Sequence, residues 1–417
     1  MNVLWTVNTF NQNIANMMGM KSSHAISWVE AMGDYLSKGG EISLAIAAPC
    51  NLSKLKKREI NGIIYYAVPS TVESWSNVVE EFRPDIIHEY GTEKNHNLIV
   101  CNIARNVPIL VSLQGILSEY QRHYYAGIDM STILRYSPVR DWLRPSGFIT
   151  GRMDFKKRSK NEIDLLKKIL YVEGRSTWDR VAALKINPQL KYFYCPRMLR
   201  KPFNEFQAWD INNIERHTIL ISQGNYPIKG VHFAFIAIAS LKSQYPDIKL
   251  IITGNDLFAD INGLHRFFKT GYVRYLYDLA KKLNILDNII FAGSKDASGM
   301  AHLLQKVHVA VIPSAIENAP NSLAEAMIIG TPCVASYVGG NMDMLKHNEE
   351  GFLYCYNEPY MLAEYIKQLF ESDELAIKFS KKARITAKER HNPDKLMAKL
   401  LGIYNEIYSE NGRCEKI

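Results

Sequence analysis

Pro313-Ser-Ala-Ile-Glu317-Asn-Ala-Pro-Asn-Ser-Leu-Ala-Glu325-Ala-Met-Ile-Ile-Gly330-Thr-Pro332-Cys-Val-Ala-Ser336 is the stretch of sequence that decides the fold. The apolar run just before it, His308–Ile312, predicts a buried strand. The residues after Pro320 predict a helix, which Gly330 and Pro332 end before a second apolar run begins a new strand. A strand, a helix and a strand in this order are typical of a parallel α/β layer.

The same stretch places two carboxylates, Glu317 and Glu325, on either side of the start of that helix. The backbone N–H groups of Asn321 and Ser322 fall in its first turn, where no intrahelical acceptor is available. A helix start of this kind binds phosphate, and the two acids would then bind hydroxyl groups on either side of it. An alternative stays open, because Ser322-Leu-Ala-Glu325 also fits a capping box, in which both side chains only cap the amino end of the helix.

The ordered pattern Pro-Ser-x-x-Glu, seven residues, then Glu-Ala-Met-x-x-Gly-x-Pro-x-Val-Ala-Ser closely resembles the retaining glycosyltransferases of family four (glycosyl transferases group 1). The resemblance extends over nearly the whole chain and is stronger in its second half. It implies the GT-B fold, with two Rossmann-like domains facing a cleft and a C-terminal helix that crosses back to the first domain. It also implies transfer of a sugar from a nucleotide-sugar donor with retention of the anomeric configuration.

The bulk composition is that of a globular protein with two domains. The chain has 417 residues, of which 47% are hydrophobic and 22% charged, and this length exceeds one ordinary core. No apolar run is long enough to cross a bilayer, and the N-terminus lacks the features of a signal peptide. The six cysteines are scattered, which favours reduced thiols and a cytoplasmic location.

The excess of positive charge lies in the first half of the chain. Residues 1–205 contain 27 Lys and Arg against 19 Asp and Glu, whereas residues 206–417 contain 23 of each. The densest basic runs are Lys54–Arg58 and Arg152–Lys160. They are either solvated surface or a site of attraction to the anionic inner face of a membrane. Nucleic acid is not expected as a partner, because no recognition motif accompanies the charge.

Short apolar runs alternate with helical patterns along the whole chain, which predicts an α/β fold. The predicted elements include a strand at Phe148–Thr150 and a polar linker at Lys201–Arg216. The domains expected are an acceptor-binding Rossmann-like domain at 1–203, a nucleotide-sugar-binding Rossmann-like domain at 204–394 and the returning helix at 395–417.

Lys229 is the cation expected at the donor diphosphate. The segment Gln223–Gly230 follows the first strand of the second half, and its Pro-x-Lys-Gly ending matches the family position of a lysine that contacts the diphosphate. A cation suits this position because negative charge builds on the leaving phosphate. A plain turn is the alternative. The family often has an Arg five residues earlier, where this chain has Gly224, so the second cation is in doubt.

The resemblance places further donor-binding residues at turns. Gly254 and Ser294 follow two strands of the second half, where the family packs around the base and the ribose. Gly19 is the one glycine in a loop after the first strand that is glycine-rich in the family. Gly339-Gly340-Asn-Met-Asp343 resembles the family's Gly-Gly-x-x-Glu, although a turn with an Asp cap explains it equally well.

Four residues of the first half are expected on the acceptor side. Gln114 stands where many family members have a histidine, and it can bind a sugar hydroxyl but cannot gain charge. The segment Pro84–His96, which includes His88 and Glu93, resembles transferases of bacterial surface-polysaccharide (capsule and O-antigen) assembly. Arg175 is the candidate for binding an acceptor phosphate. A satisfied structural histidine is an alternative for His88.

No cofactor or metal is expected. The chain lacks an Asp-x-Asp pair, a His/Cys cluster and the nucleotide-binding loops of ATP and NAD enzymes. The substrates implied are a UDP- or GDP-linked sugar and a glycan or polyprenyl-diphosphate-linked acceptor, which suits a cytoplasmic protein that is peripheral on the membrane. The catalytic residues expected are Glu317 and Lys229. Another GT-B sugar-nucleotide enzyme, such as an epimerase, and a non-catalytic sugar-nucleotide-binding subunit are the alternatives.

Overall fold

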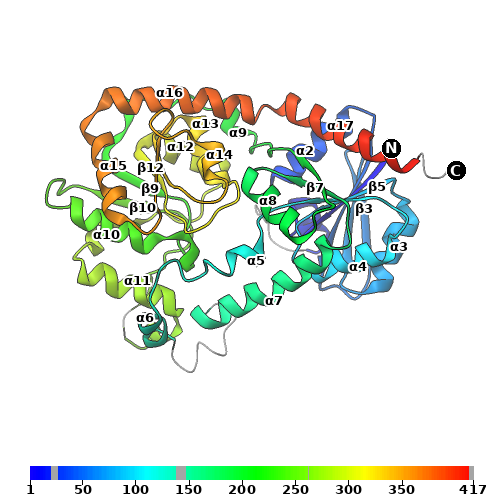
Figure 1. Cartoon of the computed structure of the whole chain (residues 1–417), viewed down its shortest axis with the longest axis horizontal. Coiled ribbons are helices and arrows are strands. Elements are labelled where there is room, and N and C mark those ends of the chain that lie inside the picture. Colours follow the sequence, from blue (N-terminus) through cyan, green and yellow to red (C-terminus); the bar gives the residue numbers. More distant parts are fainter. Residues whose placement is uncertain (20–26, 138–146, 262, 413–417) are drawn as a thin grey trace. The chain divides into compact units, whose positions relative to one another are not determined.

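A computed structural model describes residues 1–19, 27–137, 147–261 and 263–412 (Figure 1). The chain forms two compact units. Unit 1 comprises Met1–Ser118, Lys157–Lys201 and His391–Ile417, and unit 2 comprises Glu119–Lys156 and Pro202–Arg390.

Unit 1 is built on an eight-stranded sheet with the order β3-β4-β2-β1-β5-β6-β7-β8. Every neighbouring pair is parallel except β3 and β4. The strands are β1 (Asn2–Val7), β2 (Ser43–Cys50), β3 (Lys56–Ile60), β4 (Ile63–Pro69), β5 (Ile86–Tyr90), β6 (Ile109–Ser112), β7 (Tyr171–Gly174) and β8 (Lys191–Tyr194). The central strands are almost continuously buried, as expected for a parallel sheet that is covered on both faces.

Helices cover both faces of this sheet. They are α1 (Gln12–Met17), α2 (Ser27–Lys38), α3 (Val72–Phe82), α4 (Asn95–Ile103), α8 (Thr177–Ile186) and α17 (Pro393–Gly412). On one face Trp5 packs with Leu400 and Ile403 of α17. On the other face Leu4 packs with Trp75 and Val78 of α3. The last helix of the chain is therefore part of the core of unit 1.

Unit 2 is built on a six-stranded, all-parallel sheet with the order β11-β10-β9-β12-β13-β14. Its strands are β9 (Glu215–Ile221), β10 (Lys249–Ile252), β11 (Ile289–Phe291), β12 (Val307–Ile312), β13 (Cys333–Ser336) and β14 (Phe352–Tyr354). The larger helices are α10 (Val231–Leu241), α11 (Gly271–Lys282), α12 (Ala297–Lys306), α13 (Asn321–Ile329), α15 (Pro359–Glu371) and α16 (Asp373–Arg390). The short helices are α9 (Pro202–Glu205), α14 (Asn341–Met344), η2 (Ile211–Asn213), η3 (Pro227–Lys229), η4 (Gly263–Phe268) and η5 (Leu286–Asn288).

The predicted α/β architecture with two Rossmann-like units is confirmed, but one predicted strand is wrong. Residues 148–150 do not form a strand, because they begin the 19-residue helix α7 (Phe148–Leu166). The segment Lys201–Arg216, predicted as a linker, begins where the chain passes from unit 1 to unit 2 and packs against unit 2. Its Trp209 is buried, and the backbone N–H and Nε1 of Trp209 donate to carbonyl oxygens of unit 2.

The segment Glu119–Lys156 lies in unit 2, although its neighbours on both sides in the sequence lie in unit 1. It contains the end of α5 (Leu117–Tyr120), α6 (Met130–Arg135) and the start of α7. His232 of α10 lies 3.0 Å from the carbonyl oxygen of Ala126, and Tyr136 donates to Asp278 of α11 at 2.8 Å. These polar contacts attach the segment to two helices of unit 2.

The basic run Lys54–Arg58 forms most of β3, which was not predicted because charged residues are uncommon in strands. The strand lies at the edge of the unit 1 sheet and its side chains are largely exposed. Charged side chains on an edge strand oppose pairing with another chain. This run therefore has a structural explanation that requires no partner.

Candidate functional site

Lys229 and Glu317 form an ion pair in unit 2, at the carboxyl ends of two neighbouring strands. Lys229 ends η3, which follows β9, and Glu317 lies in the loop between β12 and α13. Lys229 Nζ lies 2.6 Å from Glu317 Oε1, and Ser314 Oγ donates to the same oxygen at 2.8 Å. The two residues predicted to be catalytic are therefore in direct contact.

The environment of the pair keeps Lys229 charged. Burial alone lowers the pKa of Lys229, but the adjacent Glu317 carboxylate more than offsets this and raises the pKa of Lys229 above its ordinary value. The Lys229 side chain is 19% exposed and that of Glu317 is 9% exposed, so solvent screens the pair only in part. The site therefore holds a fixed positive charge at neutral pH next to a buried acid.

Two glycines bring three loops together around Glu317. Gly230 has φ of +67°, and a Cβ atom there would lie 1.9 Å from the carbonyl oxygen of Pro313. Gly339 has φ of +50°, and its Cβ would lie 1.8 Å from the carbonyl oxygen of Glu317. Gly340 N–H donates to that same oxygen at 3.1 Å. Only glycine permits both the positive φ and this approach of backbone to backbone, so the two glycines fix the position of Glu317.

The amino end of α13 is open. Pro320 is its N-cap and provides no side-chain cap, and Asn321 and Ser322 occupy the first two helical positions. Among the residues that the structure describes, the N–H groups of Asn321 and Ser322 have no hydrogen-bond acceptor. Ser322 is therefore not the N-cap, and the capping-box alternative does not apply to this helix. The open end is free to bind an anion.

Glu325 lies one turn further along α13. It is 6% exposed. With Ser322 and Ser222, its side chain lines a small cavity beside β9 and β12. The rest of the lining is apolar and the cavity is about 10 Å³, so it has room for no more than one water molecule beside the Glu325 carboxylate.

The other predicted donor-binding residues lie at three strand ends of unit 2 and in unit 1. Gly224 follows β9, and a Cβ there would lie 2.8 Å from Val231 Cγ2. An Arg at this position therefore would not fit without a shift. Gly254 N–H donates to Gly293 O at 3.0 Å, next to exposed Ser294. Gly19 is exposed after α1, with φ of +71°.

Gln114, a predicted acceptor-side residue, lies just after β6 in unit 1 and contacts two arginines. Arg197 Nη1 donates to its side-chain Oε1 at 2.7 Å, and Arg175 Nη2 donates to its backbone oxygen at 2.8 Å. Both arginines are more than nine-tenths buried. Burial and the neighbouring charge of Arg175 lower the pKa of Arg197 to about 9.

Arg197 was missed at the sequence level, because it lies in a loop after β8 without a motif. Its neighbour Pro196 was the one local signal of a strand end.

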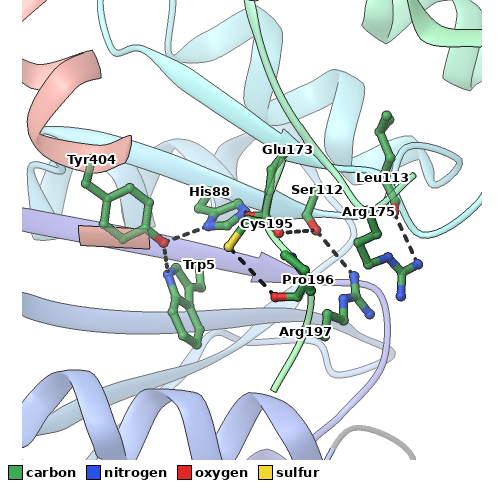
Figure 2. A network of polar contacts seen from close by, with 10 residues as sticks. All are labelled: Trp5, His88, Ser112, Leu113, Glu173, Arg175, Cys195, Pro196, Arg197 and Tyr404. Carbon is green, nitrogen blue, oxygen red and sulfur yellow. Dashed lines mark hydrogen bonds and ion pairs between the residues drawn. The ribbon is translucent and has the colours of Figure 1, made fainter. Parts of the chain in front are cut away.

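The structure places the other two acceptor-side candidates elsewhere in unit 1. His88 is fully buried in β5. Its Nδ1 lies 2.6 Å from the Tyr404 hydroxyl of α17, and its Nε2 lies 3.1 Å from Glu173 Oε2 of β7 (Figure 2). Glu93 is half-buried and its carboxylate accepts from Thr92 N–H at 3.1 Å. His88 thus lies in the core of unit 1, in contact with side chains from α17 and β7.

Within residues 1–19, 27–137, 147–261 and 263–412, no group of three or more His, Cys, Asp or Glu side chains is arranged to hold a metal ion. None of the helices in this described part is both long and apolar enough to span a bilayer.

The family match of this sequence lies within unit 2. Residues 204–386 match the family described as Glycosyl transferases group 1. The putative glycosyltransferase YtcC of Bacillus subtilis is 32% identical over 173 residues, which cover 41% of this chain and 40% of YtcC. N-acetyl-alpha-D-glucosaminyl L-malate synthase of Bacillus anthracis is 27% identical over 136 residues, 33% of this chain and 35% of that enzyme. The chain thus matches well under half the length of these relatives.

Solved structures match over almost the whole chain. Sucrose-phosphate synthase from Thermosynechococcus elongatus has a TM-score of 0.74 at 15% identity, covering 98% of this chain and 100% of that one. Anabaena HepE in complex with UDP-glucose has a TM-score of 0.65 at 16% identity, covering 96% and 99%. At these identities the likeness concerns the fold. Residues 204–386 therefore match the glycosyl transferases group 1 family, and the chain as a whole has the fold of the GT-B glycosyltransferases.

Proposed function

We propose that this chain is a retaining glycosyltransferase that moves a sugar from a nucleotide-sugar donor to a glycan or lipid-linked acceptor. One observation carries the proposal: the Lys229–Glu317 pair lies in unit 2, in the same part of the chain as the open amino end of α13. Both features fall within the residues that match the glycosyl transferases group 1 family. A cation, an acid and free N–H groups are together the groups that a sugar diphosphate requires.

Unit 2 is proposed to bind the donor. Asn321 and Ser322 bind a phosphate through their backbone N–H groups, and Lys229 binds the diphosphate and stabilises the charge that develops as the glycosidic bond breaks. Glu317 binds the hydroxyl groups of the donor sugar, and Glu325 those of the ribose. In this proposal Lys229 and α13 supply the positive charge for which other transferases use a metal ion.

The donor is proposed to be a UDP- or GDP-linked sugar. Solved structures of Anabaena HepE contain UDP or UDP-glucose, which supports a uridine nucleotide as the first choice. Gly224, Gly254 and Ser294 follow β9, β10 and β11 and are proposed to lie against the nucleotide. Gly19 in unit 1 is proposed to allow close approach of the donor.

Unit 1 is proposed to bind the acceptor through Gln114, with Arg175 near an acceptor phosphate and Glu93 at the same edge of the sheet. A glycan acceptor has support from TarM, solved in complex with Fondaparinux, and from WaaG, described as a glycosyltransferase involved in lipopolysaccharide biosynthesis. With this support we propose that the reaction belongs to the synthesis of a bacterial surface polysaccharide, on a glycan or polyprenyl-diphosphate-linked acceptor.

A peripheral position on the inner face of the membrane is part of the proposal. Four cations of α7, namely Arg152, Lys156, Lys157 and Lys160, are exposed. Each basic residue near an anionic lipid surface contributes on the order of 1 kcal/mol of attraction.

The proposed function is tested with the full chain and glucose linked to UDP, GDP or ADP. We expect one donor to raise the melting temperature and to be slowly hydrolysed. At 100 times its dissociation constant the donor stabilises the protein by about 2.7 kcal/mol. The Lys229→Met variant should lose turnover, whereas the control Lys249→Met, at the exposed amino end of β10, should not. The proposal fails if no donor binds or reacts, or if Lys229→Met retains full turnover.

A further inference from the structure

A continuous series of buried polar contacts runs through unit 1 from the last helix of the chain (Figure 2). Trp5 Nε1 of β1 donates to the Tyr404 hydroxyl of α17 at 2.9 Å. The same hydroxyl lies 2.6 Å from His88 Nδ1. Because the hydroxyl oxygen accepts from Trp5, its own hydrogen is available for His88 Nδ1.

The series continues through Glu173 to Arg197. Glu173 Oε2 lies 3.1 Å from His88 Nε2; this contact lacks hydrogen-bond geometry and is electrostatic. Ser112 Oγ donates to the other carboxylate oxygen, Glu173 Oε1, at 3.5 Å. Arg197 Nη2 donates to Ser112 Oγ at 3.3 Å. Every one of these side chains is at least nine-tenths buried, so the contacts are little screened by water.

Arg197 ends the series on the carboxamide of Gln114. A guanidinium has donors and no acceptor, so the atom of Gln114 that faces Arg197 Nη1 at 2.7 Å must be the oxygen. The amide nitrogen of Gln114 is thereby directed away from Arg197. Among the residues that the structure describes, this nitrogen has no hydrogen-bond acceptor, so its two hydrogens can be offered to a ligand.

The backbone of Arg197 is also attached to the C-terminal part of the chain. His391, two residues before α17 begins, lies with Nδ1 2.8 Å from the carbonyl oxygen of Arg197. A carbonyl can only accept, so His391 is the donor. The C-terminal segment thus contacts Arg197 directly through His391 and indirectly through Tyr404.

We propose that Tyr404, His88 and Glu173 are positioning residues that hold Arg197, and that Arg197 in turn fixes the Gln114 carboxamide with its N–H groups toward the acceptor. This inference rests on the proposed function and deepens it. Gln114 is the group that contacts the acceptor, and the last helix determines how it is presented. His88, first expected at the acceptor itself, acts through Arg197.

The electrostatics of the cluster supports this role. Burial and the charge of Arg175 both disfavour a second cation at Arg197, whereas Glu173 favours it. Without the Glu173 carboxylate, Arg197 would be a buried cation with a like charge beside it, and it would move toward solvent. The carboxylate is in turn held by Ser112 on one oxygen and contacted by His88 on the other.

The test is a double-mutant cycle on the rate of UDP-glucose hydrolysis, in which the attacking water occupies the acceptor position and is itself the ligand of the Gln114 N–H groups. Tyr404→Phe removes one hydroxyl and keeps the ring in place. Losing a hydrogen bond of about 1 kcal/mol should lower the rate about fivefold. In the Gln114→Ala background, Tyr404→Phe should lower the hydrolysis rate by less than about twofold, because the carboxamide that Tyr404 helps to position is absent. Arg197→Lys should show the same dependence on Gln114 from the other end of the series.

Two controls separate positioning from general stability. Tyr408→Phe, on the same helix but half-exposed, should leave the rate unchanged. The increase in melting temperature caused by UDP should be the same in Tyr404→Phe as in the wild type. The inference is overturned if Tyr404→Phe matches the wild type, or if its effect is equal in both backgrounds. A wild type that neither binds UDP nor hydrolyses any sugar nucleotide overturns the proposed function, and this inference with it.

Discussion

Replacing Glu317 by Gln should weaken catalysis and strengthen the binding of UDP. Glu317 and Lys229 are paired at 2.6 Å, so a diphosphate that approaches Lys229 competes with the carboxylate and is repelled by it. The glutamine side chain would keep the shape of the native residue and still accept from Ser314, but would carry no charge. The substitution therefore frees the lysine for phosphate while removing the acid that is proposed to bind the sugar.

The magnitudes follow from the exposure of the pair. The Lys229–Glu317 pair, with side chains 19% and 9% exposed, is intermediate between a surface pair and a buried pair. A surface pair contributes up to about 1 kcal/mol, whereas disruption of a buried pair costs about 3–5 kcal/mol. We expect Glu317→Gln to lower the free energy of unfolding by about 2 kcal/mol. Relief of about 1 kcal/mol of repulsion should make UDP bind about fivefold more tightly. Loss of a group aimed at the transition state should reduce turnover about 100-fold or more.

The assay combines calorimetric titration with UDP, urea unfolding and hydrolysis of the best sugar nucleotide. Glu374→Gln, at an exposed position in the first turn of α16, is the matched control and should change none of the three. Weaker UDP binding by Glu317→Gln together with unchanged turnover would refute the reasoning, because it would show that Glu317 neither competes for Lys229 nor takes part in the reaction.

Three further predictions concern the loops, the pH dependence and the surface. Gly339→Ala should destabilise the Glu317 loop and lower turnover, because a Cβ would lie 1.8 Å from Glu317 O. The loss should exceed about 1 kcal/mol, roughly the cost of a strained positive φ. Urea unfolding should show no such loss for the control Gly402→Ala in α17, whose Cβ meets no atom within 4 Å. Burial lowers the pKa of His232 to about 4. The stability that neutral His232 contributes is therefore present above about pH 6.5 and is lost as the pH falls toward 4, by about 3 kcal/mol at most. His232→Gln should flatten the pH profile of thermal unfolding over this range, and an unchanged profile would contradict the assignment. Replacing Lys156 and Lys157 of α7 by Gln should reduce sedimentation with anionic vesicles at low salt, whereas equal sedimentation of variant and wild type would exclude α7 as the contact.

Much of the fold could be predicted from local pattern. Most of the buried apolar strands follow from hydrophobic periodicity, although the buried strand β7, with Glu173 and Gly174 in its four residues, was not predicted. Lys229, Glu317 and the start of α13 follow from a dense motif. The strand predicted at residues 148–150 failed because a short β-branched run is ambiguous until the longer helical pattern of α7 is taken into account. The edge strand β3 was missed because four of its five residues are charged, and charged residues are uncommon in strands.

What could not be predicted depends on contacts between distant residues. His88 and Tyr404 are 316 positions apart, and no local signal connects them. Arg197 lies in a loop without a motif, and only its contact with Gln114 at 2.7 Å, a tertiary contact, indicates its role. The assignment of Glu119–Lys156 to unit 2 likewise depends on tertiary contacts such as that of His232 with Ala126, which override the order of the chain.

The most direct measurement is a crystal structure of the full chain with UDP. The account predicts the terminal phosphate within hydrogen-bond distance of the N–H groups of Asn321 and Ser322, Lys229 Nζ turned toward the diphosphate, and the ribose hydroxyls on Glu325. A nucleotide bound away from the start of α13, with Lys229 still paired only to Glu317, would contradict it.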